Sequence, residues 1–170
     1  MGRKAEISIE LAAVVVAAAA MWVAVSQGKA QREHNRLSVK PALTFDTDEL
    51  IDGTLVKIDL RNSGLGPATV KRFTLYIDAK PVPEKDGDIW ASAEKVLNLS
   101  DPRIKFSNYY YNAGDVIATG ERQPIIDIER DVYEKLSDGD KALWNQAMPR
   151  LKIEVDYTSF YGDEFNARYP

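Results

Sequence analysis

The segment with the clearest chemical potential is the glycine-rich run NSGLGP at residues 62–67. A loop of this kind can present successive backbone N–H groups to an anion. Phosphate-binding and dinucleotide-binding loops also require a following lysine or the start of a helix, and neither follows Pro67 in the expected place. The run therefore predicts a tight connection between two strands, in which Gly64 and Gly66 adopt positive φ angles.

Pairs of aspartates at short spacing could supply the oxygen ligands that calcium prefers. A calcium-binding loop needs further ligands at fixed steps, but Trp90 and Ala142 occupy positions where the third ligand is expected. The pairs are therefore predicted to lie in solvated turns rather than in a metal site. They are Asp46/Asp48, Asp86/Asp88 and Asp138/Asp140.

No catalytic set can be assembled from the residue types that usually carry one. The chain has no cysteine, which excludes thiolate nucleophiles, cysteine-based zinc sites and disulfides. A Ser-His-Asp triad would need His34, the single histidine, which lies in a polar segment directly after a hydrophobic run. Carboxylate pairs of the glycosidase type cannot be assigned, because acids are frequent and none has a distinctive setting. The sequence thus predicts no catalytic, cofactor-binding or metal-binding residues, and it favours a protein that is not an enzyme.

Three consecutive tyrosines, Tyr109, Tyr110 and Tyr111, are the candidates for contact with a partner. Adjacent residues of a strand point to opposite faces, so at least one of the rings should be exposed. Exposed tyrosine is enriched where proteins bind one another. The strand propensity of tyrosine explains the run almost as well, and both interpretations stay open.

The strongest structural signal is the hydrophobic run at residues 7–25. As a helix it would span about 28 Å, close to the thickness of a bilayer's hydrocarbon core. Its single charge, Glu10, falls in the first turn, and Trp22 lies near the other end, where an indole suits the membrane interface. A transmembrane anchor is the favoured interpretation. A signal peptide cleaved near Ser26 and a buried core helix are the alternatives.

A polar, basic connector follows at residues 27–36. It is predicted to be a stalk that continues the helix, and its cations Lys29, Arg32 and Arg36 are predicted to contact anionic lipid headgroups. Basic residues flank both ends of the hydrophobic run. The larger number after it slightly favours a cytoplasmic domain, whereas N-terminal anchors usually export the domain behind them, so the side stays open.

From residue 37 onward the hydrophobic period changes to two, which is typical of half-buried strands. Strands are predicted at 37–45, 54–62, 69–77, 106–111, 115–118, 124–128, 151–161 and 164–169. Short helices are predicted at 88–99, capped by Asp88, and at 140–148, ended by Pro149. The expected fold is mainly β: an N-terminal transmembrane helix and then an antiparallel, Ig-like β-sandwich with one or two short inserted helices.

The predicted organisation has four parts: a tail at 1–6, a transmembrane helix at 7–26, the basic stalk at 27–36 and a soluble β-sandwich domain at 37–170. Three segments, REHNRLSVKP at 32–41, NSGLGPATV at 62–70 and YTSFYGDEF at 157–165, resemble a group of small, uncharacterised bacterial membrane-anchored proteins. These proteins share an HNRLSV-x-P motif after the helix and an N-x-G-x-G-P-A turn. The resemblance implies a bacterial membrane-tethered β-sandwich and no activity. The expected location is the bacterial plasma (inner) membrane, crossed once.

The formal net charge of −4 lies entirely in the domain, because the charges of the first 28 residues cancel. An acidic domain repels phosphate backbones, so nucleic-acid binding is not expected. The leading hypothesis is a membrane-tethered, non-enzymatic interaction module whose partners are the lipid bilayer and a protein. The alternatives are a membrane-held enzyme that uses carboxylates and an envelope protein that binds carbohydrate.

Overall fold

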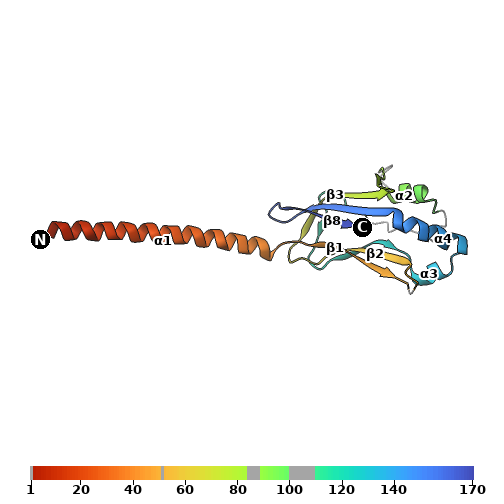
Figure 1. Ribbon diagram of the computed structural model, residues 1–170, viewed down its shortest axis with the longest axis horizontal. Helices are drawn as coiled ribbons and strands as arrows, with labels where there is room; N and C mark the ends of the chain where they lie inside the picture. The colour runs from red at the N-terminus through yellow and green to blue at the C-terminus, as the bar shows by residue number, and fades with distance from the viewer. Residues whose placement is uncertain (1, 51, 84–88, 100–109) are drawn as a thin grey trace. The chain divides into compact units, whose positions relative to one another are not determined.

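The computed structural model describes residues 2–50, 52–83, 89–99 and 110–170. It contains two compact units, Met1–Ser38 and Val39–Pro170. The first unit is a single helix, α1 (Gly2–Ser38), of 37 residues (Figure 1). At 1.5 Å per residue this helix is about 55 Å long.

Helix α1 is apolar and long enough to cross a membrane, and none of its apolar window is buried within the protein. The alternative of a buried core helix is therefore not supported, whereas an anchor and a signal sequence both fit. The connector at 27–36 is helical throughout. The strand predicted at 37–45 is wrong in its first half, because α1 runs to Ser38 and the first strand begins only at Leu43. Extending a helix that has already formed costs little, and Pro41 then prevents its continuation.

The second unit is built on two antiparallel sheets (Figure 1). Sheet A has the order β1-β2-β6, formed by Leu43–Glu49, Leu55–Asn62 and Arg122–Asp127. Sheet B has the order β4-β3-β7-β8, formed by Lys80–Pro81, Ala68–Ile77, Leu151–Thr158 and Glu164–Tyr169. The short strand β5 (Val116–Ile117) pairs with the start of β3. The expectation of a mainly β fold after an N-terminal apolar helix is confirmed.

Buried residues of both sheets belong to one hydrophobic core. Strand β7 shows the alternation of buried and outward-facing residues most clearly. Leu151, Ile153 and Val155 are buried, and the residues between them face outward. Trp144 closes the core from a helix, and its indole N–H donates to the carbonyl of Leu55 over 2.8 Å. Period-two patterning therefore places the apolar side chains of each strand on the shared interior.

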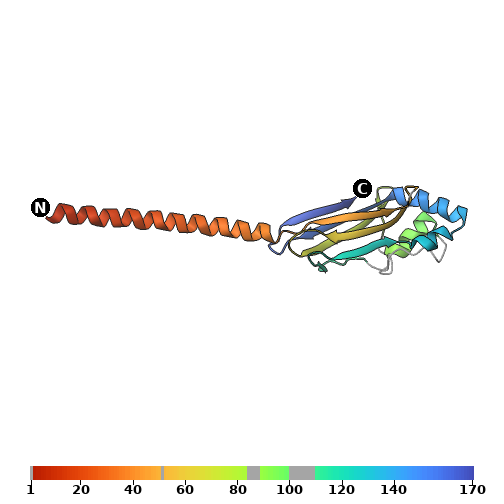
Figure 2. The same ribbon diagram turned by 90° about the horizontal axis from the view of Figure 1, so that it is seen from below.

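Short helices gather at one end of this unit (Figure 2). They are α2 (Ile89–Leu97), α3 (Arg130–Glu134), α4 (Asp138–Ala147) and the 3₁₀ turn η1 (Met148–Arg150). The two inserted helices expected from the sequence are α2 and α4, and α4 begins two residues earlier than expected, at Asp138, with Ser137 as its cap. The expected Asp88 cap lies outside the described residues. Helix α3 was not predicted, because five residues are too few to show a helical period.

The predicted strands at 54–62, 69–77, 151–161 and 164–169 correspond to β2, β3, β7 and β8. Those at 115–118 and 124–128 correspond to β5 and β6. Of the strand predicted at 106–111, residues 106–109 lie outside the described ranges, and Tyr110 and Tyr111 are not in a strand. The turn after β3 is tight, with positive φ at Asp78 (52°) and Ala79 (62°).

Candidate functional site

The loop that joins β2 to β3 (residues 63–67) is organised by Asn62, whose side chain is fully buried. Its amide nitrogen donates to the carbonyls of Gly66 (2.8 Å) and Ile117 (3.1 Å). Its oxygen accepts from the backbone N–H groups of Ala42 (3.2 Å) and Gly64 (3.0 Å). Four hydrogen bonds use the full capacity of the amide, so this residue joins the loop to β5 and to the segment that precedes β1.

Gly64 and Gly66 are needed for close packing of the backbone. A Cβ atom on Gly66 would lie 1.8 Å from the carbonyl oxygen of Val39, and one on Gly64 would lie 2.3 Å from the nitrogen of Ala42. Neither glycine has a positive φ angle, which corrects the prediction made from the sequence. Three loop N–H groups bind the protein itself rather than an anion: Ser63 donates to the carbonyl of Ala42 over 2.8 Å, Leu65 to that of Lys40 over 2.9 Å, and Gly64 to the side chain of Asn62.

Four large apolar side chains are exposed in two loops and a short strand at the end of the domain that holds the β2–β3 loop. Leu65 belongs to the β2–β3 loop, Val116 to β5, and Phe160 and Tyr161 to the β7–β8 hairpin. They are 70%, 57%, 76% and 52% exposed, respectively. The register places their elements together, because Thr69 of β3 pairs with both Val116 and Thr158. We call these four side chains the apolar loop residues.

The β7–β8 turn holds its two aromatic rings on a well-defined backbone. The hydroxyl of Ser159 accepts from the backbone N–H groups of Tyr161 (3.2 Å) and Asp163 (3.1 Å). Gly162 has a φ of 81°, the left-handed conformation that glycine adopts without strain. The rings of Phe160 and Tyr161 meet edge to face at 5.5 Å. Their exposure is therefore a feature of an ordered turn.

The base of the hairpin is fixed to the start of the domain by aromatic contacts. The rings of Tyr157 and Phe165 stack at 5.5 Å, and the Lys40 ammonium lies 5.2 Å from the Phe165 ring. The hydroxyl of Tyr157 accepts from the N–H of Leu43 over 3.2 Å. The hairpin and the β2–β3 loop thus both contact the same segment, residues 39–43.

The tyrosine run predicted for partner contact is only partly described. Tyr109 lies outside the described residues, and Tyr110 is half-buried. Tyr111 is 3% exposed and belongs to the core, so it cannot form part of an exposed contact surface in this fold. Phe160 and Tyr161 were missed because the sequence was interpreted as strand up to Tyr161, although Gly162-Asp163 marked the turn. The basic residues proposed for lipid contact, Lys29, Arg32 and Arg36, are exposed on α1.

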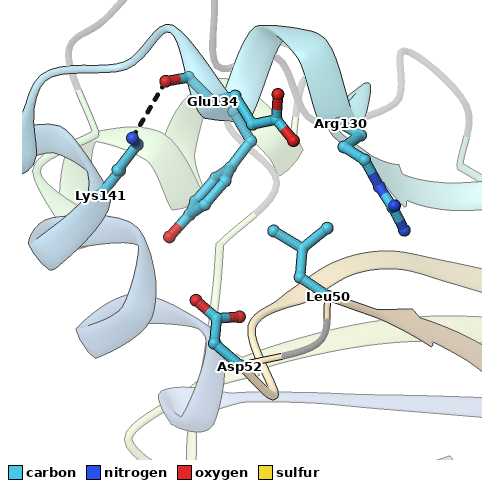
Figure 3. A pocket seen from close by; sticks show the side chains of 6 residues that line it. Leu50, Asp52, Arg130, Glu134 and Lys141 are labelled. Carbon is cyan, nitrogen blue, oxygen red and sulfur yellow. Dashed lines mark hydrogen bonds between the residues drawn. The ribbon is translucent and has the colours of Figure 1, made fainter.

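A pocket of about 460 Å³ lies at the opposite end of the domain, among the short helices (Figure 3). Lys141 of α4 donates to the carbonyl of Glu134 over 3.0 Å and lies 5.7 Å from the Tyr133 ring. Hydrogen bonds from the backbone and side chain of Thr54 lower the pKa of Asp52, which is fully exposed. A carboxyl of lowered pKa is a poorer proton donor and acceptor near neutral pH. The lining residues are Leu50, Asp52, Arg130, Tyr133, Glu134 and Lys141.

The most buried carboxylate of the described residues is Asp59 on the outer face of sheet A, at 1% exposure. Arg122 donates to it over 2.6 Å, and Lys57 lies 3.5 Å away. Arg122 also lies 3.8 Å from Asp46, the cross-strand neighbour of Asp59, and so separates two like charges. These cations enclose the carboxylate, which leaves a substrate no access to it. Within the described ranges, no three acidic or histidine side chains converge as metal ligands.

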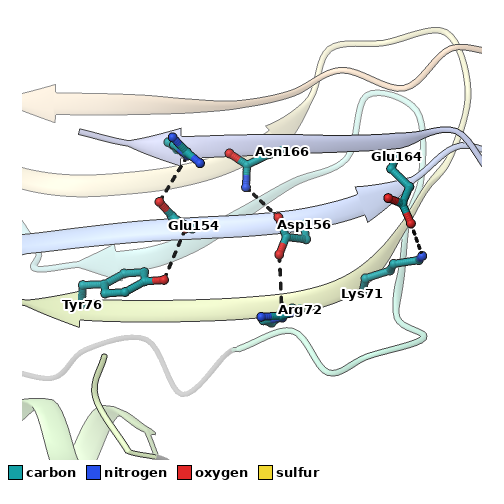
Figure 4. A network of polar contacts seen from close by, with 8 residues as sticks. Lys71, Arg72, Tyr76, Glu154, Asp156, Glu164 and Asn166 are labelled. Carbon is teal, nitrogen blue, oxygen red and sulfur yellow. Dashed lines mark hydrogen bonds and ion pairs between the residues drawn. The ribbon is translucent and has the colours of Figure 1, made fainter. Parts of the chain in front are cut away.

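The outer face of sheet B carries cross-strand polar pairs (Figure 4). Lys71 bonds Glu164 over 2.6 Å, and Asn166 donates to Asp156 over 2.7 Å. Tyr76 donates to Glu154, which also pairs with Arg168. Side chains that bind one another in this way form a hydrated surface with few unmatched groups. This face therefore contrasts with the apolar loop end.

The comparison with protein families gives one match. A family described as "Domain of unknown function (DUF8453)" matches residues 7–170. The chain belongs to this family. In this DUF8453 chain, the matched residues begin at Ile7, where the hydrophobic run starts, and extend to Pro170. The family pattern therefore includes both the apolar helix and the β domain. No curated protein matches the chain. The function of this DUF8453 member must therefore be argued from its geometry.

Proposed function

We propose that the protein is a membrane-tethered, non-enzymatic interaction module that binds a protein partner through the apolar loop residues. The observation that carries the proposal is the exposure of Leu65, Val116, Phe160 and Tyr161 at one end of the domain. Exposed apolar side chains that gather into a patch mark interaction sites on soluble domains. Burying one large apolar side chain contributes about 1.5–3 kcal/mol, so the four together would contribute about 6–12 kcal/mol toward the cost of association.

Helix α1 is the proposed anchor in a bacterial plasma membrane. Its apolar run matches the hydrocarbon thickness, and the exposure of its side chains within the protein fits a lipid environment. Lys29, Arg32 and Arg36 are proposed to favour anionic headgroups. The common core of two antiparallel sheets supports an Ig-like sandwich as the architecture of the domain. The motifs after α1 and in the β2–β3 loop are proposed to relate the chain to the small bacterial anchored proteins that it resembles.

The alternatives receive less support from the described residues. Catalysis by carboxylates requires two close acids of raised or divided pKa in a cleft, whereas the pKa of Asp52 is lowered and Asp59 is enclosed. Carbohydrate binding through aromatic residues requires a flat exposed platform, but Trp90 and Trp144 of the domain are both buried. Neither these carboxylates nor these tryptophans form an exposed surface that a partner could contact, as the apolar loop residues do.

A photo-crosslinking experiment in the native host tests the proposal. A photoreactive amino acid at Phe160 or Leu65 should give a discrete protein adduct, whereas the same group at Lys152, exposed on the outer face of sheet B, should not. The yield of this adduct should fall when Tyr161→Ser is added. Equal adducts at all three positions, or none, would contradict a partner site at the loops. Carbonate extraction of the same cells tests the anchor, and recovery of the intact chain in the soluble fraction would refute it.

A further inference from the structure

The pocket among the short helices has the size of a small-molecule site. Its volume of about 460 Å³ falls within the range of about 300–1,000 Å³ that is usual for ligand pockets. It lies between the turn after β1, which supplies Leu50 and Asp52, and the helices α3 and α4 (Figure 3). The apolar loop residues are at the other end of the domain, so this pocket is separate from the proposed partner site.

Contacts within the domain hold the walls of the pocket in place. The ring of Tyr133 is buried, and its hydroxyl donates to the side chain of Asn145 over 3.4 Å. In the turn after β1, the N–H of Leu50 donates to the carbonyl of Thr54 over 2.8 Å. The N–H of Thr54 donates to the carboxylate of Asp52 over 3.0 Å. The lining is therefore ordered without a ligand, which lowers the entropy cost of binding one.

Four charged side chains line the pocket, and none of them forms an ion pair with another described residue. The Lys141 ammonium donates to the backbone carbonyl of Glu134, which is the one contact between lining residues in Figure 3. The carboxylate of Asp52 accepts from a backbone N–H, and Arg130 and the Glu134 carboxylate have no charged partner among the described residues. The outer face of sheet B differs, because its cations pair with acids there. Unmatched charges are thus gathered around this pocket.

The unmatched charges have both signs. In the view of Figure 3, the carboxylates of Asp52 and Glu134 lie between the cations of Lys141 and Arg130, and the apolar side chain of Leu50 lies next to them. A ligand with charge of one sign would be attracted by one pair of side chains and repelled by the other pair. A zwitterion matches both pairs, and an apolar substituent on it would match the remaining wall.

We infer that this pocket binds a small zwitterion with an apolar substituent, of the class of free α-amino acids and short peptides. Arg130 holds the carboxylate of the ligand, because the guanidinium fork matches the geometry of a carboxylate. Asp52 and Glu134 hold the ammonium group. Backbone and side-chain hydrogen bonds within the turn lower the pKa of Asp52, so this carboxyl is ionised at neutral pH. The apolar substituent lies against Leu50 and the ring of Tyr133.

Isothermal titration calorimetry of the full-length protein in detergent tests the inference. The standard L-amino acids and the dipeptide glycyl-leucine are titrated first, and at least one apolar member should bind saturably at one site. The best ligand is then compared with its amide, which lacks the carboxylate, and with its deaminated acid, which lacks the ammonium group. For leucine these analogues are leucinamide and 4-methylpentanoate. Each should bind at least about tenfold more weakly, because each leaves pocket charges of one sign unmatched.

Two pairs of matched variants locate the binding. Asp52→Asn and Arg130→Gln should each weaken the best ligand about five- to tenfold, a modest loss because both side chains are exposed and their charges are partly screened. Asp48→Asn and Arg61→Gln make the same changes at exposed positions outside the pocket and should leave the affinity unchanged. Near-UV circular dichroism checks that every variant keeps the native core.

Absence of saturable binding for the whole panel up to about 10 mM would overturn the inference. Equal affinity for the zwitterion and both analogues would also overturn it, because the charges of the ligand would then not be recognised. Equal effects of all four variants, or no effect of any, would show that the ligand does not occupy this pocket. None of these results depends on the apolar loop residues, so this inference and the proposed function fail separately.

Discussion

Replacement of Gly66 by alanine should destabilise the domain more than any other single-methyl change in the β2–β3 loop. The new Cβ would lie 1.8 Å from the Val39 oxygen and 2.5 Å from its carbonyl carbon. Both are backbone atoms, so the loop itself has to shift. This shift would break two hydrogen bonds: the one from the Asn62 side-chain amide to the Gly66 carbonyl, and the one from the Leu65 N–H to the Lys40 carbonyl.

Leaving a buried hydrogen-bonding group unpaired costs about 1–3 kcal/mol, so the loss of two bonds predicts about 2–6 kcal/mol. A domain of this size is stable by only about 5–15 kcal/mol. At roughly 4 °C per kcal/mol, the melting temperature should fall by about 8–24 °C. The assay is a thermal melt of the full-length protein in detergent, followed by near-UV circular dichroism of the domain's buried tryptophans, because α1 would dominate the far-UV signal.

A matched series separates close packing from backbone conformation. Asparagine tolerates positive φ, so Gly162→Asn, at a φ of 81° with no atom within 4 Å of the added Cβ, should cost little. Gly66→Asn should be at least as damaging as Gly66→Ala, because the obstacle is the Cβ itself. If Gly66→Ala melted within a degree or two of the wild type, the explanation by close approach would be refuted.

Three further predictions concern other parts of the chain. Asn62→Asp removes both donated hydrogen bonds and buries a charge, and it should lower stability by about 3 kcal/mol or more in the same melts; a neutral result would contradict the organising role of this amide. Residues 36–170 alone should fold as a soluble, mainly β protein, and a helix-dominated far-UV spectrum would oppose this. The hydrogen bond and charge of Arg150 lower the pKa of Asp78 below its ordinary value of 3.8. Its ion pair therefore stabilises the fold above pH 3.8 and is lost as the pH falls through the lowered pKa, so the stability gap between wild type and Asp78→Asn should close in acid; a constant gap would exclude this linkage.

The elements that follow from local periodicity could be predicted from the sequence. The alternation of Leu151, Ile153 and Val155 identified β7, and Gly162-Asp163 identified the turn to β8. The reason for Gly66 could not be obtained in this way. A sequence shows that a residue lacks a Cβ, but the atom that excludes the Cβ belongs to Val39, in a distant segment brought there by folding.

The candidate contact residues show the same limit. Three adjacent tyrosines suggested an exposed surface, yet Tyr111 packs into the core. Phe160 and Tyr161 look like the end of a strand in the sequence, and only the position of the turn exposes them. Which aromatic residues face water depends on where a strand stops pairing, and the composition of the strand does not determine this.

If α1 is the proposed anchor, its uninterrupted length sets a height above the membrane. If residues 7–25 fill the hydrocarbon core, Ser26 to Ser38 project about 20 Å beyond it, while the headgroup layer is only about 5–8 Å deep. The Cα atom of Lys29 would then lie among the headgroups, about 6 Å beyond the hydrocarbon core, and those of Arg32 and Arg36 about 10 and 16 Å beyond it. The long side chains of the two arginines would have to extend back toward the lipid to contact the headgroups. The helix acts as a spacer of at most about 12–15 Å of water between the lipid surface and the point where the domain begins. Whatever the tilt of the helix, Val39, the first residue of the domain, would then lie no farther than this from the lipid surface.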